Sequence, residues 1–177
     1  MNITGGKYNR QKVIAPDENI TRPTLSKVRM SVFNTLGAII NFEGKSFLDM
    51  FAGSGIMGLE AISRGFENLT AIEKNRKVYN IIKSNFEKYQ NENDIKLIFG
   101  DSLNVCKKLN RKFDVIYIDP PYFSGIYEKS LETIKNISDG IIILEHIIEI
   151  EIPKDFEIVK QKKYGDKFIT FLKSTHD

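Results

Sequence analysis

From residue 46 onward, short apolar runs alternate with longer stretches in which apolar residues recur every three or four positions. The short runs are typical of buried strands, and the longer stretches indicate amphipathic helices. The predicted strands are Ser46–Met50, Leu69–Glu73, Lys96–Phe99, Phe113–Ile118 and Ile141–Glu145, and the predicted helices between them are Ile56–Arg64, Arg76–Gln90, Leu103–Leu109 and Ile126–Ile137. This alternation with short connections predicts an α/β fold, with a mostly parallel sheet and helices on both of its faces.

The end of the chain departs from this alternation. The segments Phe156–Lys162 and Lys167–Leu172 flank Lys163-Tyr164-Gly165-Asp166, a sequence typical of a β-hairpin turn. We expect this hairpin to add an antiparallel pair of strands to one edge of the sheet.

The first 42 residues form a predicted extension of the core. Gly5-Gly6 and Pro16-Asp17 favour a short strand or hairpin followed by a turn. From Leu25 to Ile40, apolar residues recur at helical spacing, with Thr24 as the expected cap and Arg29 off the packed face. Because no linker or repeat separates this part from the rest, we predict a single domain over residues 1–177, with an extension over 1–42 and a core over 43–177.

The first 29 residues, called the leader below, hold an excess of positive charge. Six Lys and Arg residues stand there against two acids, whereas the whole chain has a net charge of +3. The six are Lys7, Arg10, Lys12, Arg22, Lys27 and Arg29. Such a cluster could bind a polyanion, although charge alone is equally consistent with a solvated surface.

The tetrapeptide Asp119-Pro120-Pro121-Tyr122 directly follows the predicted strand Phe113–Ile118. The prolines end the strand, because proline has no N–H for the ladder and disfavours helix at the preceding residue. An Asp carboxylate and a proline carbonyl can both accept hydrogen bonds from one planar NH2 group, and the tyrosine ring offers a face for stacking. The motif therefore suits the exocyclic amine of a nucleobase, although Asp-Pro-Pro alone often forms only a turn.

The first predicted strand leads into Gly53, Gly55 and Gly58, which form a G-x-G-x-x-G motif between a strand and a helix. In this setting the glycines let the backbone approach a ligand at the helix N-terminus. The second strand ends at Glu73, eighteen residues after Gly55, where a carboxylate can accept hydrogen bonds from both ribose hydroxyls. Together these features predict a cofactor that contains a nucleoside.

Acidic residues at successive strand ends narrow the choice of cofactor. Asp49 lies four positions before the first glycine, where it would repel a pyrophosphate but attract an amino group. Asp101 follows the third strand and could accept from an adenine amine. The three acids match the ammonium, ribose and adenine of S-adenosylmethionine, and a dinucleotide dehydrogenase is the weaker alternative. The predicted cofactor-binding residues are Asp49, Phe51, Gly53, Ser54, Gly55, Glu73, Lys74, Asp101 and Ser102.

The composition limits other kinds of site. Cys106 is the single cysteine, which excludes an intramolecular disulfide, and with only His146 and His176 besides it no metal is expected. Cys106 is expected in the core, and a pocket-lining role for Glu145-His146 stays open. No apolar run approaches the roughly 20 residues of a membrane helix, and the first residues do not resemble a signal peptide. We expect a cytoplasmic protein, with a monomer as the default state.

With these motifs together, the chain resembles the class I S-adenosylmethionine-dependent methyltransferases that act on exocyclic amines, and more closely the RsmD-type 16S rRNA guanine-N2 methyltransferases. The resemblance covers nearly the whole chain, through Arg22-Pro23-Thr24, Val28-Arg29, Phe33-Asn34, the glycine motif, Glu73, Asp101 and Asp119–Tyr122. The chain departs from the family pattern at Asn9-Arg10, where many relatives have Gly-Arg, and at Met30, where an acid is usual.

The resemblance implies a Rossmann-like seven-stranded sheet and methylation of a guanine N2 amine in 16S ribosomal RNA, either free or in the small ribosomal subunit. It implies catalytic roles for Asp119, Pro120 and Tyr122. Together with the charge of the leader, it predicts RNA contacts by Lys7, Arg10, Lys12, Arg22, Thr24 and Arg29. Two alternatives stay open: an adenine-N6 or other base-amine methyltransferase acting on DNA or RNA, and a non-catalytic RNA-binding or ribosome-assembly protein that retains the fold.

Overall fold

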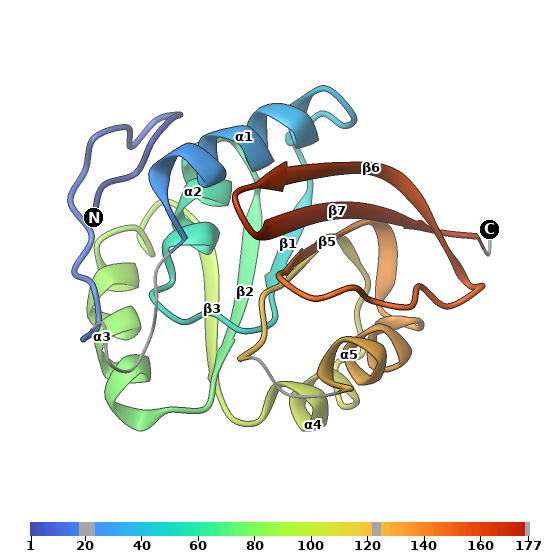
Figure 1. Ribbon diagram of the computed structural model, residues 1–177. Helices are drawn as coiled ribbons and strands as arrows, with labels where there is room; N and C mark the ends of the chain where they lie inside the picture. Colours follow the sequence, from blue (N-terminus) through green and yellow to red (C-terminus); the bar gives the residue numbers. More distant parts are fainter. Residues whose placement is uncertain (18–23, 122–124, 176–177) are drawn as a thin grey trace.

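The computed structural model of the protein describes residues 1–17, 24–121 and 125–175, which form a seven-stranded sheet covered by helices (Figure 1). The strands are β1 (Ser46–Asp49), β2 (Asn68–Glu73), β3 (Asp94–Phe99), β4 (Phe113–Ile118), β5 (Ser138–His146), β6 (Phe156–Tyr164) and β7 (Lys167–Ser174), in the order β3-β2-β1-β4-β5-β7-β6. Strands β1 to β5 pair in parallel, whereas β7 is antiparallel to both β5 and β6. The predicted parallel sheet with an antiparallel C-terminal hairpin is confirmed.

Strand β1 lies near the middle of the sheet, and all four of its residues are buried. It pairs with β2 on one side and β4 on the other, so that Asp49 aligns with Ala71 and with Tyr117. Because these strands are parallel, their carboxyl ends meet at one edge of the sheet, where ligands bind in folds of this kind. The same edge receives Asp49, Glu73 and Asp119 from three neighbouring strands.

The helices form two layers, one on each face of the sheet. They are α1 (Ser26–Gly37), α2 (Ile56–Ser63), α3 (Arg76–Glu87), α4 (Ser102–Cys106) and α5 (Ile126–Ile134). One hydrophobic cluster joins the sheet to α1, α2 and α3, and a second joins it to α4 and α5. Alternate residues of β4 supply the two clusters, with Val115 and Tyr117 in the first and Ile116 and Ile118 in the second, as the two-residue period of a strand requires.

The helices end earlier than their apolar periodicity predicts. Helix α3 ends at Glu87 rather than Gln90, α4 at Cys106 rather than Leu109, and α5 at Ile134 rather than Ile137. The residues that follow form turns, yet Tyr89 and Ile137 are still buried against the core. Their hydrophobicity therefore reflects packing after the helix has ended. No helix within the described ranges is long and apolar enough to cross a membrane.

The N-terminal segment folds back on itself, as the sequence predicts. An antiparallel bridge joins Asn2 to Lys12, and the backbone N–H of Val13 donates to the carbonyl of Met1 at 2.9 Å. The segment docks on α3 through Asn85, whose amide accepts from Ile14 N at 3.0 Å and donates to Ile14 O at 2.9 Å. One buried amide thus satisfies both backbone groups of a residue outside any sheet.

The start of α1 differs from the prediction. Leu25 occupies the N-cap position with no side-chain cap, so the assignment of Thr24 as the cap is wrong. Thr24 is instead buried, and its hydroxyl donates to Glu145 at 3.5 Å. The hydroxyl is used for a contact with the end of β5 rather than for the free N–H groups of the helix.

Candidate active site

A cavity of about 310 Å³ opens at the carboxyl ends of the central strands. Its lining includes most of the predicted cofactor residues together with the predicted catalytic ones: Asp49, Phe51, Gly53, Ser54, Glu73, Lys74, Ser102, Asp119 and Pro120. Residues separated by up to 71 positions in sequence therefore share one enclosed space. A cavity of this size can enclose parts of two reacting molecules.

The glycine motif forms a tight turn between β1 and α2. Gly53 and Gly55 both have left-handed backbone conformations, with φ of 54° and 76°, which residues with a Cβ rarely adopt. A Cβ on Gly55 would also lie 3.0 Å from side-chain atoms of Ile82 and Phe86 on α3. A Cβ on Gly58 would lie 2.7 Å from Leu69 of β2. Gly53 lines the cavity, whereas Gly55 and Gly58 let the turn and α2 pack closely behind it.

Glu73, at the end of β2, is fixed in place by the backbone around it. Its Oε2 accepts a hydrogen bond from Gly53 N at 3.1 Å, and its Oε1 accepts from Asn75 N at 2.7 Å. The first contact ties the glycine turn to β2. Each carboxylate oxygen has a second lone pair, so Glu73 can still accept hydrogen bonds from a ligand.

Asp49 is a buried carboxylate in the cavity wall. It is 1% exposed, and within the described part of the chain neither carboxylate oxygen has a hydrogen-bond partner of good geometry. Burial, with a contribution from the negative charge of Glu73, raises the pKa of Asp49 to about 7, and the nearby backbone N–H groups of Gly58 and Phe51 only partly oppose this rise. An uncompensated buried carboxylate is costly, and a cationic group of a ligand would relieve that cost.

Asp101 and Ser102 are neighbours in sequence but differ in burial and in their position relative to the cavity. Ser102 is buried, lines the cavity and donates its hydroxyl to Met50 O at 2.5 Å. Asp101 is exposed, caps α4 by accepting from Asn104 N at 3.0 Å, and is not among the described lining residues. Its role as an acceptor for an adenine amine stays a prediction.

Asp119 and Pro120 follow β4 into the cavity from the side opposite Glu73. Asp119 is partly buried, and burial together with the charge of Glu145 raises its pKa well above the usual value, while the ammonium of Lys167 opposes this rise. Pro120, the next residue, is buried and lines the same cavity. Tyr122, the third predicted catalytic residue, lies outside the described residues, as does Arg22.

Sequence reasoning missed part of this wall. Tyr117 and Lys167 both line the cavity, and both contact the carboxylate of Glu145 behind it. The sequence left a pocket-lining role for Glu145 open but contained no signal for Lys167. Lys167 reaches the site only because β7 runs antiparallel along β5, a long-range pairing that a local pattern does not fix.

Among the predicted RNA-contacting residues of the leader, Lys7, Arg10 and Lys12 are exposed. Lys7 forms an ion pair with Glu92 at 2.8 Å, in which both side chains remain more than half exposed. An exposed pair of this kind is weak and leaves the ammonium accessible to a phosphate. The accessibility of these three residues is compatible with RNA contacts.

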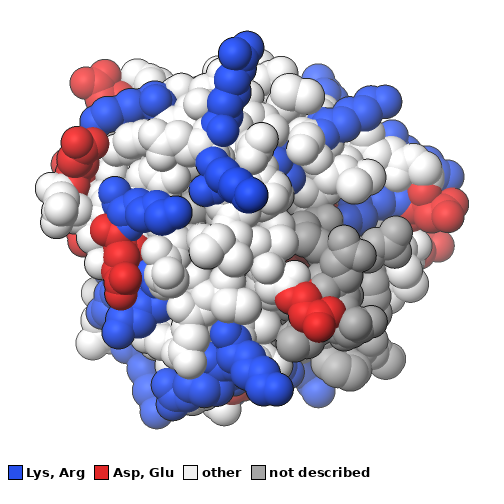
Figure 2. Space-filling model, turned by 90° about the vertical axis from the view of Figure 1, so that its left-hand side faces the viewer, with Lys and Arg blue, Asp and Glu red and all other residues white. Residues whose placement is uncertain are grey.

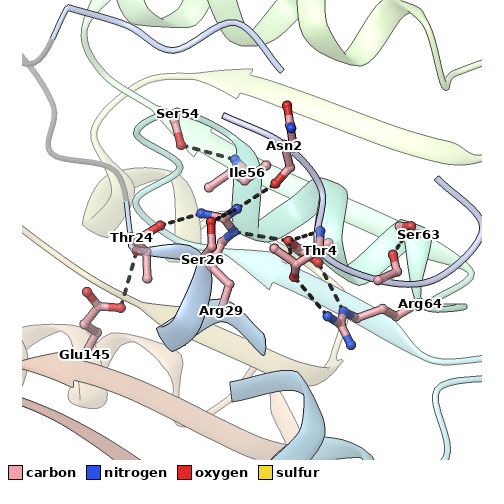
Figure 3. A network of polar contacts seen from close by, with 12 residues as sticks. Asn2, Thr4, Thr24, Ser26, Arg29, Ser54, Ile56, Ser63, Arg64 and Glu145 are labelled. Carbon is pink, nitrogen blue, oxygen red and sulfur yellow. Dashed lines mark hydrogen bonds and ion pairs between the residues drawn. The ribbon is translucent and has the colours of Figure 1, made fainter. Parts of the chain in front are cut away.

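Arg29 is placed quite differently from the prediction, which is wrong on this point. The residue is 2% exposed, and its guanidinium donates to Glu60 Oε1 at 3.1 Å, Thr24 O at 2.5 Å and Asn2 O at 2.6 Å (Figure 3). Although the residue lies off the apolar face of α1, the leader covers that side of the helix. A guanidinium enclosed in this way is not available to a phosphate.

The sheet order, the glycine turn and the acidic residues at neighbouring strand ends define a methyltransferase with the Rossmann-like class I fold. The structure of yhhF from Escherichia coli has the same fold, with a TM-score of 0.88 at 23% identity over 100% of this chain and 99% of that one. The chain belongs to the RsmD-type family, because the family model described as Conserved hypothetical protein 95 matches residues 1–173. This confirms the family that the motifs predict.

Two relatives illustrate the family. YlbH of Bacillus subtilis is 34% identical to this chain over 174 residues, which are 92% of each sequence. The ribosomal RNA small subunit methyltransferase D of Buchnera aphidicola is 30% identical over 167 residues, 90% of this chain and 86% of its own. The similarity therefore extends over the leader as well as the core.

Proposed function

We propose that the protein transfers a methyl group from S-adenosylmethionine to the exocyclic N2 amine of a guanine in small-subunit ribosomal RNA. The strongest support is the single cavity that contains Asp119 and Pro120 together with the glycine turn, Asp49 and Glu73. The proposed acceptor for an amine and the proposed binding groups for a nucleoside thus share one cavity. The name of the Buchnera relative supports a small-subunit ribosomal RNA substrate.

The residues of the cavity fit the proposed cofactor. The unpartnered carboxylate of Asp49 would pair with its ammonium, and Glu73 would accept hydrogen bonds from its ribose hydroxyls. Gly53 and Ser54 would let the backbone approach it closely, with Phe51 and Ser102 completing the wall. When bound, S-adenosylmethionine supplies a methyl group on a positively charged sulfur.

Asp119 and Pro120 would act on the substrate by positioning it. The lone pair of an aromatic amine is delocalised into the ring, so the amine is a weak nucleophile. Hydrogen bonds from the NH2 group to the Asp119 carboxylate and the Pro120 carbonyl would favour a tetrahedral nitrogen and aim its lone pair at the cofactor half of the cavity. The methylated nitrogen is cationic and loses a proton readily, so the site needs no strong base. The guanine must leave its stack to reach these groups.

The RNA would contact the face formed by the leader and α3. Between residues 74 and 88, five Lys and Arg residues stand against one acid, and all five are exposed: Lys74, Arg76, Lys77, Lys83 and Lys88. Figure 2 shows this side of the molecule, where Lys and Arg side chains outnumber acidic ones. Because Lys74 also lines the cavity, the basic surface begins at its mouth. The basic residues of α3 do not stand out in the sequence, because beyond residue 29 the acidic residues as a whole slightly outnumber the basic ones.

Incubation with labelled S-adenosylmethionine tests the proposal. Ribosomal RNA, small ribosomal subunits and DNA are offered separately, and the labelled nucleosides are identified after digestion. N2-methylguanosine from RNA or subunits is the expected product. Label in N6-methyladenine would favour the alternative base-amine methyltransferase. RNA binding without label in any substrate would favour the non-catalytic alternative.

A further inference from the structure

A buried charge cluster lies behind the amine-binding half of the cavity. Glu145, at the end of β5, is fully buried, and its carboxylate accepts hydrogen bonds from the hydroxyls of Tyr117 and Thr24. The ammonium of Lys167, from the first residue of β7, pairs with the same carboxylate. The backbone carbonyl of Glu145 accepts from Tyr127 at 2.9 Å. Four separate parts of the chain therefore converge on one acid.

The partners of Glu145 face the cavity, although Glu145 itself does not line it. Thr24, Tyr117 and Lys167 belong to the same wall as Asp119. The Lys167 side chain is 27% exposed while that of Glu145 is 0% exposed, so the ion pair presents its cationic end to the cavity.

The charges that face Asp119 come from three strands. Glu145 contributes a negative charge from β5, Asp49 a second negative charge from β1, and Lys167 a positive charge from β7. Tyr117 of β4 adds none, because burial and the charge of Glu145 raise its pKa well above the usual value and keep the phenol protonated. Lys167 is thus the cation that opposes two acids around Asp119.

We propose that Lys167, oriented by Glu145, is a positioning residue that favours the ionised form of Asp119, the form that best accepts the hydrogen bond of the substrate amine. The role rests on the proposed function, in which Asp119 binds that amine. A protonated Asp119 would be a weaker acceptor, because one of its oxygens would carry an O–H donor and the negative charge would be lost. Lys167 acts through Asp119 and need not touch the substrate.

Lys167 and Glu145 are expected to shift the pKa of Asp119 in opposite directions. Burial first, and then the charge of Glu145, raise the pKa of Asp119, whereas the charge of Lys167 lowers it. Removing Lys167 should therefore let Asp119 keep its proton to a higher pH. Removing the charge of Glu145 should let Asp119 lose its proton at a lower pH. Shifts in opposite directions would show that both charges act on Asp119, and the pH dependence of turnover then shows whether this matters for the reaction.

Carboxyl-carbon NMR titration of the free protein directly tests whether Lys167 and Glu145 shift the titration of Asp119. The signal of Asp119 is identified by its loss in Asp119→Asn. We expect Lys167→Met to raise the midpoint of this signal by roughly 1–3 pH units, the range produced by a neighbouring opposite charge. Glu145→Gln, which can keep hydrogen bonds to its neighbours, should lower the midpoint, and Lys167→Arg should leave it close to the wild-type value. Lys173→Met, which removes an exposed lysine from the same strand, is the matched control.

The pH dependence of turnover provides the second readout. With saturating cofactor and RNA, the acidic limb of kcat should move upward in Lys167→Met and recover at high pH, with the cofactor Kd nearly unchanged. An unshifted Asp119 midpoint in folded Lys167→Met, or shifts of the same sign in Lys167→Met and Glu145→Gln, would overturn the proposal. If the wild-type protein methylates no substrate, the proposed function fails, while the titration still decides whether Lys167 controls Asp119.

Discussion

Asp119 is the side chain on which the proposed chemistry most depends, because it is the proposed carboxylate acceptor for the amine and lines the cavity next to Pro120. We expect Asp119→Ala to lower turnover at least about a hundredfold, as loss of one positioned polar group does in other active sites. Cofactor binding should persist, since the glycine turn and Glu73 lie across the cavity. A single-turnover methylation assay, run beside a cofactor titration, measures the two effects separately.

The matched control for this variant is Asp139→Ala. Asp139 is an exposed carboxylate near the amino end of β5, where it pairs with Lys112 at 3.3 Å, at the edge of the sheet away from the cavity. Turnover of this control should stay close to that of the wild type. Near-normal turnover in Asp119→Ala would contradict the assignment of Asp119 as the acceptor for the amine.

Asp49 gives a prediction about stability as well as about binding. The pKa of Asp49 rises from 3.8 to about 7 on folding, mainly through burial, so the folded state holds a proton that the unfolded state releases. Between these two values the unfolded state binds fewer protons, and stability without cofactor should fall as the pH rises toward 7. Asp49→Asn removes this penalty. We expect the variant to have a higher Tm than the wild type at pH 8, and a cofactor Kd at least about tenfold weaker.

Thermal denaturation between pH 5 and pH 8, with calorimetric cofactor titrations, checks both parts. The Tm of Asp49→Asn should vary less with pH than that of the wild type. A variant that is less stable than the wild type at pH 8, with unchanged cofactor affinity, would show that Asp49 serves the fold and not a cationic ligand.

The contact between α1, α2 and the leader depends on a buried ion-pair network. Glu60 of α2 is fully buried and accepts from Arg29 at 3.1 Å, from Arg64 at 3.1 Å and from Thr4 N at 2.8 Å (Figure 3). Arg29 in turn holds the carbonyl of Thr24, whose side chain reaches the cavity wall. The network thus connects the helix that follows the glycine turn with the wall near Asp119.

Removing Arg29 should therefore destabilise the protein strongly. Arg29→Met leaves Glu60 buried without one of its cations, and breaking such a pair costs about 3–5 kcal/mol. Arg29→Lys should cost less, because it keeps the charge but loses the planar fork that reaches Thr24 and Asn2 together. Urea denaturation measures these changes, with Lys27→Met on the exposed side of α1 as a control expected within about 0.5 kcal/mol of the wild type. Equal losses in Arg29→Met and Lys27→Met would show that the network is not stabilising.

These elements also show how far sequence alone could predict the molecule. The β1–turn–α2 unit and strand β4, which ends just before Asp119, were predictable, because local periodicity, glycine and proline fix them. Arg29 was not, since helical spacing identifies the apolar face of α1 but not which segment covers its polar side. The pairing of Lys167 with Glu145 depends on the register between β5 and β7, which is set by contacts between residues distant in sequence.

The whole molecule has an uneven distribution of charge, which suggests how RNA would approach it. The positive charge of the leader and α3 lies on the side of the molecule viewed in Figure 2. The leader and α3 belong to one hydrophobic cluster, whereas α4 and α5 belong to the other, on the opposite face of the sheet. Lys74 lines the cavity and lies just before α3. A polyanion would therefore be attracted to the face that holds both α3 and the cavity mouth. The effect of removing positive charge on RNA binding can therefore be compared between the two faces of one protein.

Neutralising this face should flatten the salt dependence of RNA binding. The variants are Lys7→Gln/Arg10→Gln/Lys12→Gln in the leader and Lys77→Gln/Lys83→Gln/Lys88→Gln on α3, and the control on the opposite face is Lys107→Gln/Lys108→Gln/Lys129→Gln, all at exposed positions. Each phosphate contact contributes roughly 0.7–0.9 to the slope of log K against log salt, so each test variant should lose about two units of slope. The control, with the same change in net charge, should keep the wild-type slope, because a distant charge affects binding only through the weak long-range field. Binding titrations at several salt concentrations measure the slopes, and equal slopes in all three variants would mean that RNA does not bind across the leader and α3.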